Sequence, residues 1–172
     1  MSIQLPRVRL PVGVVVERRR AANPWVEHVW RPVAVLAGVP EAAPWTEISN
    51  AADAVGFFAG NTEIELYRSE TAHYRDNLGS GAPALWVVLR PTGREPPFEL
   101  KTVTADPTEG EGFTEAGTDL VEQVPMPEPI RRAIAAFIAE HPVEHPFAKR
   151  ERDRADPETL GRRVPARKGR QS

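Results

Sequence analysis

The chain has 172 residues, of which 41% are hydrophobic and 27% are charged, and this composition predicts a soluble globular domain with an ordinary core. It contains no cysteine, which excludes disulfides, cysteine-ligated zinc or iron–sulfur sites and thiol catalysis. The formal net charge of −2 provides no bulk attraction to nucleic acid or to an anionic membrane.

Charge is distributed unevenly along the chain. Residues 147–172 carry nine basic and four acidic side chains, whereas the rest carries thirteen basic and twenty acidic ones. We therefore expect an N-terminal extension at 1–6, a folded domain at 7–146 and a basic, disordered tail at 147–172. Because no apolar stretch has the length of a signal peptide or a membrane span, we expect a cytoplasmic protein with no membrane partner.

The first elements in chain order form a predicted hairpin. Val12, Val14 and Val16 alternate as they do on one face of a strand. A turn is expected at Asn23–Pro24, followed by a second strand from Glu27 to Leu36. Pro32 lacks the amide proton that a ladder needs, so this second strand is expected to be an edge strand or to carry a bulge.

The middle of the chain alternates between strand and helix signals. Residues 51–60 fit either a helical turn or a strand, and "TEIELYR" is an alternating strand with Ile64 and Leu66 facing inward. "SETAHYRDNLG" predicts a short helix that is capped by Ser69 or Thr71 and ends at Gly79.

The second half of the chain predicts two more strands and a helix. "ALWVVLR" is apolar enough to be a central strand, and "FELKTVT" alternates. Residues 106–122 contain six carboxylates and three glycines and are expected to be a loop. "PEPIRRAIAAFIAEH" has the apolar period of an amphipathic helix. The predicted fold class is therefore α+β: a single domain with about five mainly antiparallel strands in a curved sheet or partial barrel, followed by a C-terminal helix.

Motifs for catalysis or for binding metals and cofactors are weak. "HPVEH", residues 141–145, matches the H-x-x-E-H pattern of some zinc peptidases, but Pro142 and Pro146 prevent the helix that this pattern requires. No phosphate-binding glycine loop is present, and no serine lies in a nucleophile elbow. The sequence thus predicts no catalytic residue, no metal ligand and no cofactor, and it favours a non-catalytic protein over an enzyme.

The first group of candidate binding residues lies in the hairpin: Arg18, Arg19, Trp25, Trp30 and Arg31. If the hairpin closes around Asn23–Pro24, the two arginines of the first strand fall nearly opposite Trp30 and Arg31. Two interpretations stay open. The arginines can cover the tryptophans through cation–π contacts, or the group can be a hot spot for a protein partner.

A second candidate group lies on the short helix. Glu70, Tyr74 and Asn77 share one helical face. Tyr74 and Asn77 can bind the helix to the sheet through hydrogen bonds, or the face can contribute to a partner-binding surface.

Several stretches together resemble a known family: "VGVVVERRRAANPWVEHVWRPVAVL", "ETAHYRDNL", "PALWVVLRP", "VPMPEPI" and "FAKRERDR". They resemble an uncharacterised proteobacterial family, defined as a domain of unknown function and commonly encoded beside molybdenum-containing formate dehydrogenases and their maturation factors. The resemblance covers about residues 8–154 and transfers no catalytic role to any residue.

This resemblance implies a biological setting. The main hypothesis is a non-catalytic accessory protein for maturation or assembly of a molybdenum formate dehydrogenase, with an enzyme subunit or a maturation factor as its protein partner. One alternative is a protein that handles a molybdopterin nucleotide, although the glycine-rich loop of nucleotidyltransferases is missing. The other is nucleic acid contact through the basic tail, which the net charge disfavours.

Overall fold

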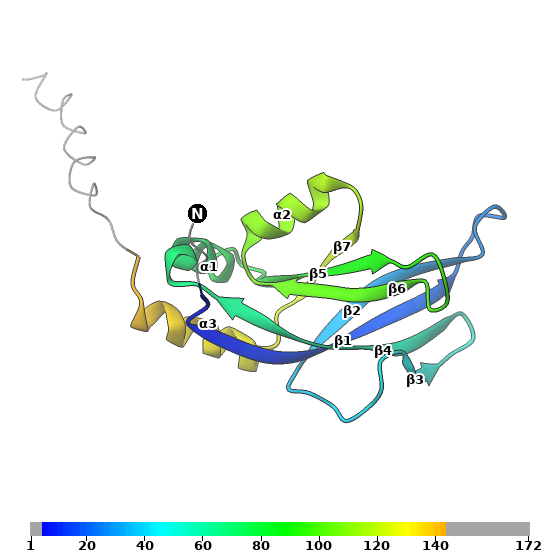
Figure 1. Cartoon of the computed structure of the whole chain (residues 1–172), viewed down its shortest axis with the longest axis horizontal. Coiled ribbons are helices and arrows are strands. Elements are labelled where there is room, and N and C mark those ends of the chain that lie inside the picture. Colours follow the sequence, from blue (N-terminus) through cyan, green and yellow to red (C-terminus); the bar gives the residue numbers. More distant parts are fainter. Residues whose placement is uncertain (1–4, 144–172) are drawn as a thin grey trace, which may run out of the picture. The chain divides into compact units, whose positions relative to one another are not determined.

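A computed structural model of the chain describes residues 5–143. The described residues form an α+β domain with seven strands, three α-helices and one 3-10 turn, all within the compact unit Met1–Pro142 (Figure 1). The expected disorder at 147–172 lies outside the described residues, as do the last residues of the predicted domain. No helix of residues 5–143 is long and apolar enough to cross a bilayer.

The first sheet has four antiparallel strands in the order β2-β1-β4-β3. Their bounds are Val8–Arg20 for β1, His28–Ala37 for β2, Thr46–Asn50 for β3 and Ala54–Leu66 for β4. The prediction that Val12, Val14 and Val16 share one face of a strand is confirmed, because all three lie in β1 and are fully buried. The ambiguous residues 51–60 and the predicted strand after them largely form one long strand, β4, whereas β3 was not predicted.

Both expectations for Pro32 are confirmed. β2 is an edge strand of its sheet, and the pairing shifts where Val15 lies opposite Ala34 and Val16 lies opposite Pro32. One extra residue, Val33, therefore forms a bulge, and the regular alternation expected for this strand is interrupted there.

The second sheet has three antiparallel strands in the order β6-β5-β7. Their bounds are Ala84–Pro91 for β5, Phe98–Thr104 for β6 and Leu120–Pro125 for β7. β5 is the central strand, and its first six residues are buried, as its apolar sequence predicted.

The prediction of a loop at 106–122 was wrong. These residues form helix α2 (Pro107–Ala116) and the first half of strand β7. Asp106 caps the helix by accepting from the Thr108 and Glu109 amides, Pro107 occupies its first turn, and Gly117 ends it in the left-handed region at φ 74°. The number of carboxylates and glycines concealed these start and stop signals.

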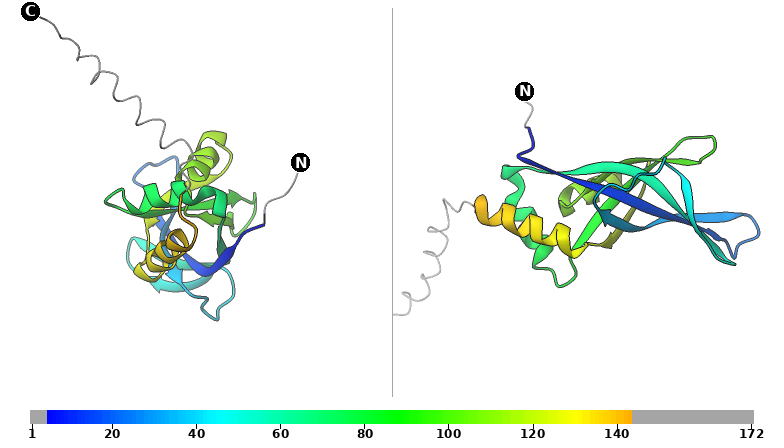
Figure 2. Two further views of the ribbon diagram at one scale, coloured as in Figure 1. Left: turned by 90° about the vertical axis from the view of Figure 1, so that its left-hand side faces the viewer. Right: turned by 90° about the horizontal axis from the view of Figure 1, so that it is seen from below.

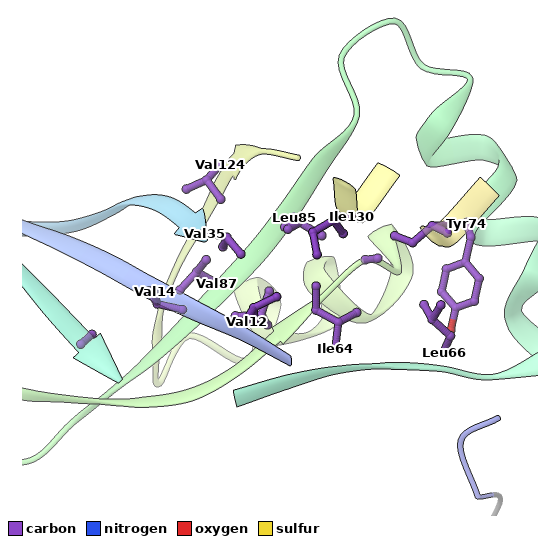
Figure 3. Packing of buried hydrophobic residues seen from close by; sticks show 14 of the residues in the cluster. Val12, Val14, Val35, Ile64, Leu66, Tyr74, Leu85, Val87, Val124 and Ile130 are labelled. Atoms are coloured by element: carbon purple, nitrogen blue, oxygen red, sulfur yellow. The ribbon is translucent and has the colours of Figure 1, made fainter. Parts of the chain in front are cut away.

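Two sheets, and not a curved single sheet or partial barrel, carry the core. β4 lies beside β6 and β2 lies beside β7, but the sheets do not close into a barrel. Side chains of β1, β2, β4, β5 and β7 meet between the sheets (Figure 3). The predicted C-terminal helix is confirmed as α3 (Glu128–Glu140), which adds Ile130, Ile134 and Phe137 to this core.

Helix α1 (Thr71–Leu78) follows the 3-10 turn Arg68–Glu70 and lies beside α3, where Tyr74 contacts Phe137 edge-on at 6.0 Å. The expected side-chain cap is absent, because the Thr71 hydroxyl donates to the Arg68 carbonyl and Glu70 is the N-cap residue. Gly79 ends the helix without a positive φ. Helix α3 ends at Glu140, which agrees with the helix break predicted at "HPVEH". The last two residues of that motif, Glu144 and His145, lie outside the described residues.

Candidate functional site

The hairpin between β1 and β2 projects from the end of the domain that lies opposite α1 and α3 (Figure 2). Its loop closes where the Ala21 amide donates to the Glu27 carbonyl at 3.2 Å. The predicted turn at Asn23–Pro24 is confirmed, since the Asn23 side chain accepts from the Trp25 amide at 2.7 Å and the Val26 amide donates to the Asn23 carbonyl. Trp25 at the tip is 88% exposed.

The register of the hairpin places the arginines on two different faces. Arg18 lies directly opposite Trp30, as expected, but Arg19 lies opposite Val29, and Arg31 lies opposite Glu17. Since neighbouring residues of a strand point to opposite faces, the Arg18 and Arg19 side chains diverge. The two arginines therefore lie nearly opposite Trp30 and Arg31, as predicted, but on different faces of the hairpin.

The inner face of the hairpin carries an aromatic cluster. Trp30 stacks on Phe57 with ring centres 5.6 Å apart and contacts Trp45 edge-on at 6.1 Å. The guanidinium of the half-buried Arg18 lies 5.7 Å from the Trp30 ring and 5.4 Å from the Phe57 ring. Arg18 therefore covers the aromatic cluster, a cation–π contact of about 0.5–2 kcal/mol.

Replacing Trp30 with alanine is expected to lower the free energy of unfolding by about 2 kcal/mol, because the variant loses three aromatic contacts around a partly buried ring. Val29→Ala, one residue away on the exposed face, should change stability by about 0.5 kcal/mol or less. Urea unfolding of both variants provides the measurement. Equal losses would mean that Trp30 contributes no more than an exposed side chain.

The opposite face and the tip form a second surface, which we call the hairpin surface: Arg19, Trp25, Val26, Val29, Arg31 and Val33. Its valines are exposed by between 37% and 47%. Arg19 pairs with Glu17 at 3.1 Å and Arg31 reaches Glu122 at 3.9 Å, yet both arginine side chains remain more than half exposed. Apolar groups and guanidinium groups are thus presented together to solvent.

A depression of about 210 Å³ lies on the inner side of the hairpin and is lined in part by Arg18, Arg20 and His28. Neither Arg19 nor Arg31 lines it. Its volume is below the roughly 300–1,000 Å³ typical of small-molecule pockets.

On helix α1, Tyr74 and Asn77 are structural. The Tyr74 hydroxyl accepts from the Tyr67 amide at 2.9 Å, and burial is the main cause that raises the pKa of this phenol. Asn77 donates to the carbonyls of Ala84 and Ala105 and accepts from the Ala84 amide. The hydrogen bonds expected of the two side chains are present: Asn77 bonds to the start of β5 and to the residue after β6, and Tyr74 bonds to the residue after β4.

Glu70, the third residue of that group, belongs to a cluster that the sequence did not reveal. His73 Nδ1 lies 3.0 Å from Glu70 Oε1 and 3.0 Å from Asp106 Oδ1. We call Glu70, His73 and Asp106 the carboxylate–histidine cluster. Glu70 and His73 are one turn apart, but Asp106 arrives from the junction of β6 and α2, so no local spacing could have indicated it.

The cluster borders an open pocket of about 470 Å³, which is also lined by Tyr67, Tyr74, Thr108 and Glu109. The His73 Nδ1 atom is buried and completes no well-aligned hydrogen bond among the described residues, although both carboxylates lie within contact distance. The close Asp106 carboxylate is the largest cause that raises the pKa of His73, and burial opposes it.

The eight predicted partner-binding residues do not form one surface. The hairpin lies at one end of the domain, whereas Glu70, Tyr74 and Asn77 lie with α1 at the other (Figures 1 and 2). Among the hairpin residues, Trp25, Arg19 and Arg31 are presented to solvent, whereas Arg18 and Trp30 contact the aromatic cluster.

Comparisons with known proteins place the chain in a family. Searches of curated proteins and of solved structures gave no match. Residues 11–151 match a family described as "Protein of unknown function (DUF3305)". This match covers the hairpin, all three helices and every strand except the first three residues of β1, and the chain is therefore a member of the DUF3305 family.

Proposed function

We propose that the protein is a non-catalytic accessory protein that docks another protein through the hairpin surface. The observation that carries this proposal is the exposure of Trp25 at the hairpin tip, beside the apolar side chains of Val26 and Val29. Tryptophan and arginine are enriched among the residues that dominate binding energy in protein interfaces. The arginines Arg19 and Arg31 flank the apolar groups, which suits a partner surface with acidic residues around an apolar depression.

The proposed partner is a subunit of a molybdenum-containing formate dehydrogenase, or one of its maturation factors, in a proteobacterial cytoplasm. Support comes from the resemblance to a family that is commonly encoded beside such enzymes. The lack of cysteine suits a soluble escort and provides no thiolate for an electron-carrying iron–sulfur cluster.

Two alternatives have less support. Handling of a molybdopterin nucleotide requires a basic pocket, and the depression beside Arg18 and Arg20 is small for such a ligand. Nucleic acid contact would depend on the basic residues after Phe147, which lie outside the described residues, and the net charge of the chain is negative.

The test is affinity capture of the tagged protein from native cells, followed by identification of the bound proteins. We expect a formate dehydrogenase subunit or maturation factor to be retained at low salt and reduced at high salt. The reason is that the screening length for exposed charges falls from about 8–10 Å at physiological ionic strength to about 3 Å at 1 M salt. Trp25→Ala should reduce the retained partner about tenfold or more without lowering the melting temperature. Ile48→Ala, which removes a half-exposed apolar side chain on β3, outside the hairpin, is the control and should retain the partner.

Retention of the same partner by the Trp25→Ala variant would contradict docking through the hairpin. Recovery of neither a formate dehydrogenase subunit nor a maturation factor would contradict the proposed setting. Capture of a nucleic acid instead of a protein would favour the alternative in which the basic tail contacts nucleic acid.

A further inference from the structure

The carboxylate–histidine cluster has an arrangement that the proposed docking function does not use. It lies beside α1, away from the hairpin, and combines one imidazole nitrogen with two carboxylates. The three potential ligand atoms all lie within 4.8 Å of one another. Imidazole and carboxylate groups together are suited to divalent first-row transition metals.

We propose that Glu70, His73 and Asp106 form a binding site for a divalent transition-metal cation, for which Mn²⁺ is the reference ion. Two ligands at right angles, each about 2.1 Å from a metal ion, lie about 3.0 Å apart. Both carboxylate oxygens lie at this separation from His73 Nδ1. The three atoms can therefore surround one ion with little movement, and water can complete its coordination from the open pocket.

The state of His73 Nδ1 supports a cation at this position. If the imidazole is neutral with its proton on Nε2, the Nδ1 lone pair faces two negatively charged oxygens, and a metal ion between the three atoms would replace this repulsion by coordination. If Nδ1 carries the proton, its N–H is not well aligned with either carboxylate in the structure. A metal ion placed between the three atoms would satisfy all of them together.

The surroundings of the cluster are negatively charged and ordered. Glu109 adds a third carboxylate to the pocket, and none of the described residues that line it is a lysine or an arginine. The Ser69 hydroxyl donates to Glu70 Oε2 at 3.0 Å, and the Thr108 amide donates to Asp106 Oδ1 at 2.9 Å. These contacts hold two of the ligands in place before a metal arrives, as outer-shell partners do in metal sites.

Calorimetry and electron paramagnetic resonance of the full-length protein, freed of metal with a chelator, test the proposal with Mn²⁺ as the probe. We expect calorimetry to give one Mn²⁺ bound per chain. The paramagnetic resonance signal of free Mn²⁺ should fall in proportion to the amount of protein added. His73→Gln and Glu70→Gln should each weaken binding at least about tenfold, since even outer-shell partners of metal ligands contribute 10–100-fold. Mn²⁺ should raise the melting temperature of the unaltered protein but not of these variants.

Two further variants keep the test independent of folding. Asp106→Asn keeps the α2 cap, because asparagine caps as well as aspartate, but removes the charge and should weaken binding to the same extent. Glu111→Gln, on the same helix but lining a different depression, is the matched control and should bind Mn²⁺ as the unaltered protein does. If Mn²⁺ binding does not saturate, the proposed site is overturned. If every variant binds Mn²⁺ equally, the metal is an adventitious ion only, and the proposed site is overturned as well. Neither outcome bears on docking through Trp25.

Discussion

Asn77→Ala is expected to lower the free energy of unfolding by about 3 kcal/mol. The Asn77 side chain is 4% exposed and makes three hydrogen bonds of 2.8–3.0 Å, with the Ala84 amide, the Ala84 carbonyl and the Ala105 carbonyl. Alanine would leave buried backbone groups without these partners, and each unsatisfied buried group costs about 1–3 kcal/mol. The effect should be large because one side chain joins α1 to both β5 and the end of β6.

Urea unfolding followed by circular dichroism measures this loss. Asp76→Ala is the matched control, because Asp76 is the neighbouring residue on the exposed side of α1. The control should change the free energy of unfolding by no more than about 0.5 kcal/mol. Similar losses in both variants would show that the Asn77 hydrogen bonds do not hold α1 to the sheet.

Gly110→Ala is expected to be about as damaging, with a loss of about 3 kcal/mol. Gly110 lies where α2 crosses the buried Trp86 of β5, and an added Cβ would come within 2.3 Å of the indole ring. Real side chains do not approach so closely, so the helix or the indole must move. Overpacking of this kind costs about 1–3 kcal/mol and occasionally more.

Gly112→Ala provides an internal control on the same helix. A Cβ at Gly112 meets no atom within 4 Å, and alanine is the better helix former. This variant should therefore be more stable than the unaltered protein by about 0.5–1 kcal/mol. Thermal melting of the pair gives changes of opposite sign if α2 packs on Trp86 as described, and a neutral Gly110→Ala would contradict that packing.

Strands and helices with strong periodicity could be predicted from the sequence. The valines of β1, the apolar run of β5 and the stripe of α3 all occupy the core, because each repeats with the period of its element. Pro32 even indicated the bulge in β2, since its missing amide proton is a local property.

Other parts could not be predicted for identifiable reasons. In α2 a high content of carboxylate and glycine concealed the Asp106–Pro107 start and the Gly117 end. β3 is exposed along its whole length and so has no hydrophobic pattern. The hairpin register depends on where the loop closes, and this determined that Arg18 covers Trp30 while Arg19 points away.

The two candidate sites also differ in how much of each could be predicted from the sequence. The hairpin residues are close in sequence, so their grouping was visible, although their division between two faces was not. The carboxylate–histidine cluster joins His73 to a residue 33 positions later through the order of the strands, and a single sequence contains no local sign of that contact.

The central proposal is that this protein supports a molybdenum-containing formate dehydrogenase by binding a partner protein and not by catalysis. Its most direct test is the formate dehydrogenase activity of a deletion strain grown with formate and molybdate, alongside the transcript level of the enzyme genes. We expect activity to fall while transcripts stay constant, and we expect the Ile48→Ala protein but not the Trp25→Ala protein to restore activity. Normal enzyme activity in the deletion strain would contradict the account.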